Sequence, residues 1–222
     1  MPSQATHEAV RVDVGVIAVD GDLRVREGAA GLVIFAHGSG SSRFSRRNRT
    51  VAGVLEAAGF GTLLLDLLTP DEEAVDERTR EYRFDIDLLG RRAVGAADWM
   101  QARPDLHHLP LAFFGASTGA AAALLAAAAR PEITRAVISR GGRPDLADEA
   151  LPNVQAPTLL IVGGADESVI EMNREAMRRM RAPVELEIIP GATHLFEEPG
   201  ALEQVARLAA DWCRRHLKES MA

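Results

Sequence analysis

The sequence predicts an α/β fold, in which a mostly parallel sheet has helices on both faces. Short apolar runs alternate along the chain with longer helical segments, and this alternation is typical of βαβ units. The runs are continuously apolar, as expected for parallel strands that are buried on both sides. A hairpin near the start of the chain predicts that the sheet also has an antiparallel edge.

Composition indicates one ordinary globular domain over residues 1–222, of which we expect 1–8 to be flexible. The formal net charge of −7 disfavours a nucleic-acid partner, because phosphate binding needs a basic face. Cys213 is the single cysteine, which excludes an intrachain disulfide. No secretory signal is visible in the first ten residues, and the longest apolar stretch, 120–129, is too short to span a membrane. We therefore expect a cytoplasmic protein without a membrane partner.

The antiparallel edge is expected from the first two strands. Residues 10–19 and 22–26 have the composition of strands. Asp20 and Gly21 between them form a dipeptide that favours a two-residue hairpin turn. The hairpin is therefore predicted to turn at Asp20-Gly21.

Six further apolar runs predict the buried strands of the sheet. They are 31–36, 62–66, 111–114, 133–139, 158–162 and 184–189. Helices are expected at 46–58, 84–101, 118–130, 172–180 and 201–217. Gly59 closes the first helix, and apolar residues recur with helical spacing through the second. Residues 67–80 are acidic and irregular, so we expect a surface loop there. No insertion is long enough for a lid domain, which predicts an open site or one covered by short loops.

The most informative motif is Gly115-Ala116-Ser117-Thr118-Gly119. It follows the strand at 111–114 and precedes an alanine-rich helix. A G-x-S-x-G turn between a strand and a helix is a nucleophile elbow, which holds a serine at the tip of a strained turn. Chance matches to this pattern are frequent, so the motif predicts a nucleophile only if a base, an acid and an oxyanion site accompany it.

His194 is the expected base, because it follows the last predicted strand and catalytic groups gather at the carboxyl ends of parallel strands. Asp166 follows the strand before it and is the expected acid. Ser117, Asp166 and His194 then occur in the chain order of hydrolases with this elbow. The other carboxylates considered for the acid are Glu167, Asp145 and Asp148. Asp166 has a structural alternative as the N-cap of the next helix.

An oxyanion site needs two preorganised N–H donors. The amide of Thr118, directly after the nucleophile, is one expected donor. The amide of Ser39 is the other, because His37-Gly38 lies in the loop after the first buried parallel strand. We expect His37 itself to close this loop by hydrogen bonds. A phosphate-binding interpretation of the same glycines fails, since neither the Walker pattern nor G-x-G-x-x-G is present.

With these elements in this order, the chain resembles the α/β-hydrolase superfamily, and more narrowly the small, lidless serine hydrolases grouped with dienelactone hydrolases. The resemblance runs from the His37-Gly38 loop to the final helix. It implies a sheet of about eight strands, a Ser-His-Asp triad, an acyl-enzyme intermediate and no cofactor. One position departs from the pattern: dienelactone hydrolases proper use a cysteine nucleophile, and Ser117 stands there in this chain. Ester or thioester hydrolysis is therefore favoured over lactone opening.

Residues beside the predicted site are candidates for substrate binding. Phe44, Phe196 and Leu195 could line an acyl pocket, which the few aromatics predict to be small. His37 and Gly38 are further candidates for contact with the substrate. Two arginine clusters follow strand ends and could bind an anionic substrate. The first contains Arg43 and the second contains Arg140 and Arg143. The alternative, which we favour, is that these arginines face water or pair with nearby acids.

The sequence therefore predicts a serine hydrolase that cleaves esters of small or medium acyl groups, with a small-molecule ester as its partner. A thioesterase or acyl transferase would use the same triad. A binding protein with a hydrolase fold and no activity is the alternative from another class. The oligomeric state is open between a monomer and a homodimer.

Overall fold

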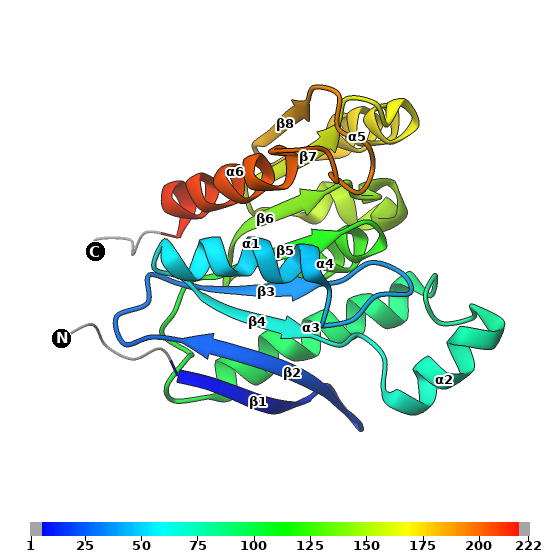
Figure 1. The fold of residues 1–222 in the computed structure, drawn as a ribbon. Coiled ribbons are helices and arrows are strands. Elements are labelled where there is room, and N and C mark those ends of the chain that lie inside the picture. Colours follow the sequence, from blue (N-terminus) through cyan, green and yellow to red (C-terminus); the bar gives the residue numbers. More distant parts are fainter. Residues whose placement is uncertain (1–5, 218–222) are drawn as a thin grey trace.

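The computed structural model describes residues 6–217, which form an eight-stranded sheet with helices on both faces (Figure 1). In chain order the strands are β1 (Thr6–Asp13), β2 (Ala18–Val25), β3 (Leu32–Ala36), β4 (Gly61–Leu65), β5 (Leu111–Ala116), β6 (Thr134–Arg140), β7 (Thr158–Gly163) and β8 (Val184–Ile189). Their spatial order is β1-β2-β4-β3-β5-β6-β7-β8. The β1–β2 and β2–β4 pairs are antiparallel and all the others are parallel. This confirms the predicted fold class.

Two helical layers cover the sheet. One face carries α1 (Arg46–Ala57) and α6 (Ala201–His216), and the other carries α3 (Ile86–Ala102), α4 (Thr118–Ala129) and α5 (Glu167–Arg179). A 3-10 segment, η1 (Pro144–Asn153), packs against α4 and α5. Within residues 6–217, no helix combines the length and the hydropathy needed to cross a membrane.

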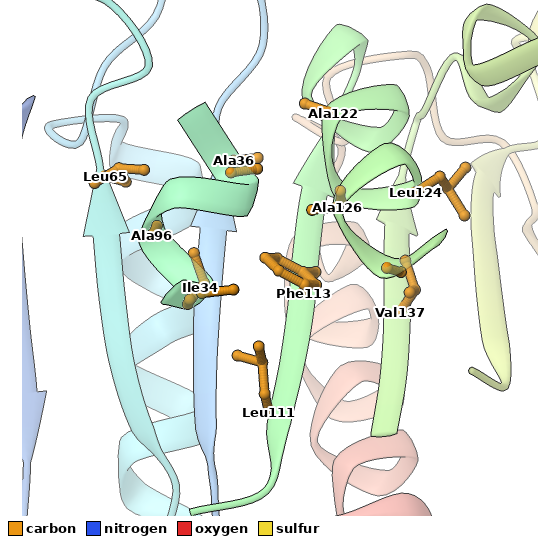
Figure 2. Close-up of a cluster of buried hydrophobic side chains, with 14 of the residues drawn as sticks. Ile34, Ala36, Leu65, Ala96, Leu111, Phe113, Ala122, Leu124, Ala126 and Val137 are labelled. Atoms are coloured by element: carbon orange, nitrogen blue, oxygen red, sulfur yellow. The ribbon is translucent and has the colours of Figure 1, made fainter. Parts of the chain in front are cut away.

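The core lies between the central strands and these two layers. Figure 2 shows Ile34, Leu111 and Phe113 on the face of the sheet that α3 and α4 cover. On the opposite face Phe35 and Phe114 pack with their ring centroids 4.8 Å apart. Helix α4 is buried on nearly all sides, which explains its almost purely apolar sequence. Its small alanines bring the helix close to β5, the strand that precedes it.

The hairpin turns at residues 14–17, so the prediction of a turn at Asp20-Gly21 was wrong. The turn is closed by a 2.9 Å hydrogen bond from the Val14 amide to the Ile17 carbonyl, and Gly15 takes the positive φ of 96° that it needs. Gly21 instead lies within β2, where a Cβ would come within 3.0 Å of the Leu63 side chain. Close strand packing, rather than turning, explains this glycine.

The expected flexibility of residues 1–8 was also wrong in part. Residues 6–8 belong to β1 and pair with residues 23–25 of β2. Residues 1–5 lie outside the part of the chain that the structure describes.

Residues 67–80 contain a helix, α2 (Pro70–Thr79), where the sequence led us to expect a loop. Local signals build it: Thr69 and Glu72 form a capping box, and Pro70 occupies the first helical position. The helix has no apolar face, and Asp76 is its single buried residue, which explains why hydrophobic periodicity missed it. Figure 1 shows α2 apart from the two helix layers, beyond the carboxyl ends of β3 and β4.

Candidate active site

Ser117 lies at the turn between β5 and α4 in a strained conformation, with φ 51° and ψ −123°. A Cβ on Gly115 would lie 2.4 Å from the Ala120 Cα atom, and one on Gly119 would lie 2.3 Å from the Ala36 carbonyl oxygen. Both positions are therefore restricted to glycine by backbone contacts. Positive φ is costly for a non-glycine residue, and such strain persists only where the surroundings impose it. The surroundings here hold Ser117 at the carboxyl edge of the sheet, partly exposed.

We predict that Gly119→Ala lowers the free energy of unfolding by about 3 kcal/mol, because the new methyl group meets rigid backbone of β3. Urea unfolding measures this. Gly53→Ala is the matched control, since Gly53 lies exposed in α1 with nothing within 4 Å of the added Cβ. Alanine there should be neutral or stabilising by up to about 1 kcal/mol. Equal stabilities of the two variants would contradict the close packing of the elbow.

Asp166 and His194 meet at the ends of β7 and β8. The Asp166 Oδ2 atom lies 2.7 Å from the His194 Nδ1 atom. Asp166 occupies the N-cap position of α5, but its side chain makes no capping hydrogen bond. The geometry thus favours the interaction with His194 over the capping alternative.

The other carboxylates considered for this role are engaged elsewhere or exposed. Asp145 binds Arg143 at 2.8 Å, and Asp148 binds Arg179 at 2.7 Å. Glu167 is exposed in the first turn of α5. Asp166 is therefore the carboxylate that the fold brings to the histidine.

Ser117 and His194 both lie against residues 140 and 141. The Ser117 amide donates to the Arg140 carbonyl at 3.2 Å. A Cβ on Gly141 would lie 3.0 Å from the His194 carbonyl oxygen and 3.6 Å from its ring Cε1 atom. Among residues 6–217, no hydrogen bond joins the Ser117 hydroxyl to the His194 ring. Catalytic hydrogen bonds are often long without substrate and tighten when it binds.

The loop after β3 passes directly over the elbow. A Cβ on Gly38 would lie 3.0 Å from the Ser117 Cβ atom. The Ser39 amide donates to the Thr118 Oγ1 atom at 3.0 Å. The structure therefore brings together the two residues expected to supply oxyanion donors. It also adds a feature that the sequence did not reveal, since in this state the Thr118 hydroxyl accepts the Ser39 N–H.

His37 is buried beneath this loop and fixes its shape. Its Nε2 atom accepts a 3.0 Å hydrogen bond from the Leu67 amide, so the ring proton is on Nδ1, which donates to the Gly38 carbonyl at 2.9 Å. Burial lowers the pKa of His37 below its ordinary value of 6.5, against smaller raising effects of the Gly38 hydrogen bond and the Asp66 charge. His37 thus closes the loop by hydrogen bonds, as the sequence led us to expect, and it does so as a neutral imidazole.

This burial predicts a pH dependence of stability. Because the folded-state pKa of His37 is lowered, its contribution is complete above about pH 6.5 and is lost as the pH falls toward the folded-state value. We predict that His37→Leu costs about 1–3 kcal/mol at pH 7.5 by leaving the Leu67 amide unpaired. The variant should also lose stability less steeply than the wild type between pH 7.5 and 5.

Urea unfolding at several pH values measures both effects. Exposed His108 offers the control His108→Leu, which should stay within about 0.5 kcal/mol of the wild type. If the free energy of unfolding of His37→Leu depended on pH as steeply as that of the wild type, His37 would not be a histidine that is buried in its neutral form.

The two arginine clusters differ in their partners. The Arg43 guanidinium binds Asp66 and lies 3.6 Å from Asp22, and Arg143 binds Asp145. These two arginines are neutralised by nearby acids, as the favoured alternative holds. Arg140 is different: it is only 7% exposed, and no carboxylate of residues 6–217 pairs with it.

Of the three apolar candidates, Phe196 is buried in the core at 1% exposure, whereas Leu195 and Phe44 are exposed. Leu195 is 39% exposed directly after His194. Phe44 is 54% exposed, and the guanidinium carbons of Arg43 and Arg49 lie 4.3 and 4.8 Å from its ring centroid. The solvent thus reaches both side chains.

Sequence reasoning missed Asp66 and Asn48. Asp66 accepts a 2.6 Å hydrogen bond from the Arg43 amide and so ties the loop after β3 to the end of β4. Because Asp66 directly follows a buried strand, the sequence could have indicated that it lies at the same edge of the sheet as the predicted site. Asn48 is buried in the first turn of α1, where its Oδ1 atom accepts a long, 3.4 Å bond from the Arg140 Nη2 atom. Nothing in the sequence marks it.

A cavity of about 190 Å³ lies between the loop after β3 and α2, on the side of His37 and Leu67. Its lining includes Glu73 and Asp76 but not Ser117. Burial and the neighbouring Asp66 charge raise the pKa of Glu73. Within residues 6–217, no group of three or more His, Cys, Asp or Glu side chains is arranged to hold a metal ion.

The fold and the elbow together define an α/β hydrolase. Residues 25–218 match the dienelactone hydrolase family, and the chain belongs to that family. It is 58% identical to a dienelactone hydrolase from Anabaena variabilis ATCC 29413. That crystal structure matches 97% of this chain and 100% of its own, with a TM-score of 0.95. Est1E from Butyrivibrio proteoclasticus shares the fold at 18% identity and a TM-score of 0.77, over 93% of this chain and 98% of its own.

A relative in Mycobacterium tuberculosis strain H37Rv carries the provisional name phosphoribosyl transferase. It is 56% identical over 210 residues, which are 95% of this chain but 46% of that protein. The chain thus spans about half the length of this relative.

Proposed function

We propose that this protein is a serine hydrolase that cleaves carboxylic esters of small or medium acyl groups. The observation that carries the proposal is the 2.7 Å contact between Asp166 and His194, made by a carboxylate that leaves its helix uncapped. It lies at the same sheet edge as the strained Ser117. Membership of the dienelactone hydrolase family supports hydrolytic chemistry.

In the proposed mechanism the Asp166 carboxylate accepts a hydrogen bond from the Nδ1–H group of His194, which leaves Nε2 unprotonated and free to act as base. His194 removes the Ser117 proton as the serine oxygen attacks the ester carbonyl, and Asp166 stabilises the resulting imidazolium. His194 then protonates the leaving alcohol, giving an acyl-enzyme. A water molecule activated by His194 releases the acid and restores Ser117.

The developing oxyanion is held by the amides of Thr118 and Ser39. The Thr118 amide is in the first turn of α4, where the helix itself supplies no partner. The Ser39 amide must turn from the Thr118 hydroxyl toward the substrate, or be shared between them. Each donor of this kind contributes about 100- to 1000-fold to the rate.

A panel of substrates tests the proposal. Purified protein is assayed with p-nitrophenyl esters of increasing acyl length and with acyl-CoA thioesters of matched length. We expect turnover of the short and medium oxygen esters. Preference for the thioesters would reassign the chain as a thioesterase, and failure to turn over any substrate would favour a binding protein without activity.

A further inference from the structure

Arg140 is a buried cation without a counter-charge in the described part of the chain. It is the last residue of β6 and 7% exposed. The 3.4 Å bond to Asn48 is its one side-chain hydrogen bond, and its buried Nε atom has no partner among residues 6–217. A buried charge is costly unless it is paired and hydrogen-bonded. An anion at this position would neutralise the Arg140 charge and accept the hydrogen bonds that its guanidinium can donate.

The Arg140 side chain points toward the amino end of α1. Alternate residues of a strand face the same side of a sheet. Ala136 and Ile138 of β6 belong to the core cluster under α1 and α6, so Arg140 faces that side as well. Its contact with Asn48, in the first turn of α1, agrees with this direction.

The amino end of α1 adds further positive character. The first amides of a helix lack intrahelical partners and attract anions. In α1 the Ser45 side chain caps the Asn48 amide at 3.3 Å, which leaves the amides before it for an anion, and the first turn contains no acidic residue. It contains Arg47, whose Nη1 atom lies 3.3 Å from the exposed Glu197 and whose buried Nε atom has no partner in the described chain. Burial, and then the Arg47 charge, lower the pKa of Arg140 to about 10, so Arg140 is still charged at neutral pH.

This region adjoins the proposed nucleophile. Ala116, the residue before Ser117, pairs with Arg140 across β5 and β6, and the Ser117 amide donates to the Arg140 carbonyl. The loop after β3, which contains Ser39, leads into α1, and the loop that contains His194 lies against Gly141. An anionic group beside Arg140 would therefore belong to a molecule that also reaches Ser117.

We propose that Arg140 and the first turn of α1 bind an oxyanion group of the substrate, a carboxylate or a phosphate. The substrate class is then an ester that carries this negative group at a distance from the scissile carbonyl, which rests on the proposed ester hydrolysis at Ser117. A guanidinium fork can hold either group with two parallel hydrogen bonds. Arg43 and Arg143 have no such role, because their own acids neutralise them.

Matched substrates test this inference. The kcat and KM of wild type and Arg140→Met are measured at constant ionic strength with p-nitrophenyl hydrogen adipate and p-nitrophenyl heptanoate. The two substrates are similar in length, but only the first is anionic. We expect wild type to favour the adipate ester. Arg140→Met should lose about ten- to 100-fold in kcat/KM for that ester, mostly through KM, and little for the neutral one.

Arg135→Met is the control, because Arg135 is exposed near the opposite end of β6. It should leave both substrates unchanged. Adipate and inorganic phosphate are also tested as inhibitors of heptanoate hydrolysis, and the better inhibitor identifies which oxyanion the site takes. Glu197→Gln should strengthen that inhibition by removing the competing carboxylate.

Failure of the inference and failure of the proposed function give different results. Hydrolysis of the neutral ester, with no preference for the anionic one and no inhibition by either anion, would overturn the inference and leave the ester hydrolase intact. If neither ester is hydrolysed, the proposed function fails. A rise in the Tm of wild type with adipate or phosphate, absent in Arg140→Met, would still establish the anion site. If Arg140→Met does not fold, Arg140→Lys replaces it, because lysine keeps the positive charge but lacks the guanidinium fork. The preference of the wild type for the adipate ester, and its inhibition by adipate or phosphate, then decide whether the anion site exists.

Discussion

Ser117→Ala is expected to lower kcat for p-nitrophenyl ester hydrolysis by about 10⁶-fold, the scale on which removal of a nucleophile in a serine triad acts. Without the hydroxyl no acyl-enzyme can form, and the base has no proton to remove. The protein should remain folded, since alanine keeps the small size that the elbow requires at this position. Steady-state kinetics together with a thermal unfolding curve measure both outcomes.

Ser168→Ala is the matched control, because Ser168 is an exposed serine in the first turn of α5. It should retain the wild-type rate. A folded Ser117→Ala variant with more than about 1% of wild-type activity would place the chemistry elsewhere, because the residual catalysis left by the oxyanion hole and by binding is far smaller.

Asp166→Asn is expected to lower kcat by about 10⁴-fold with the fold unchanged. The asparagine amide can donate to the His194 Nδ1 atom, which places the remaining ring proton on Nε2. In that tautomer His194 cannot accept the proton of Ser117. The same kinetic assay measures the loss, and the rate of Ser117 labelling by a fluorophosphonate should fall in parallel.

Asp148→Asn is the matched control for Asp166→Asn, because it makes the same change at another carboxylate. Asp148 was a sequence-level alternative for the acid, and the structure pairs it with Arg179 at an exposed position. Its variant should keep nearly full activity. If Asp148→Asn were the slower of the two variants, the assignment of Asp166 would be wrong.

Most of the sheet could be predicted because its strands are local features. The continuous apolar runs of β3 and β5 are sufficient to indicate buried strands, and the Gly115–Gly119 motif combines with its flanking elements to indicate the elbow. The glycines of this motif can be recognised in the sequence because the turn requires them. At Gly119, for example, the backbone of β3 leaves no room for a larger residue.

The errors in the predicted hairpin turn and in the segment 67–80 arose where a residue is required by contacts with residues that are distant in the sequence. Gly21 suggested a turn, but it is required by the side chains of Leu63 and Val10 that pack against it across the sheet. Helix α2 has no apolar stripe, because it buries Asp76, which accepts hydrogen bonds from Arg83 and from the amides that follow the helix. Hydrophobic periodicity cannot detect a helix that is held in this way.

The partners of the arginines were likewise beyond the sequence. Arg43 pairs with Asp66 and Arg143 pairs with Asp145, whereas Arg140 lies buried beside Asn48 and pairs with no acid within residues 6–217. All three follow strand ends and looked equivalent in the chain. Only the fold separates the neutralised arginines from the unneutralised one.

The central claim, that Ser117 is an activated nucleophile, is tested most directly by covalent labelling of the wild type. Folded protein is treated with a fluorophosphonate probe and the modified peptide is identified by mass spectrometry. We predict one label per chain on Ser117, and slow or absent labelling after the protein is denatured. Absence of labelling in the folded protein, or modification of a different serine, would contradict it.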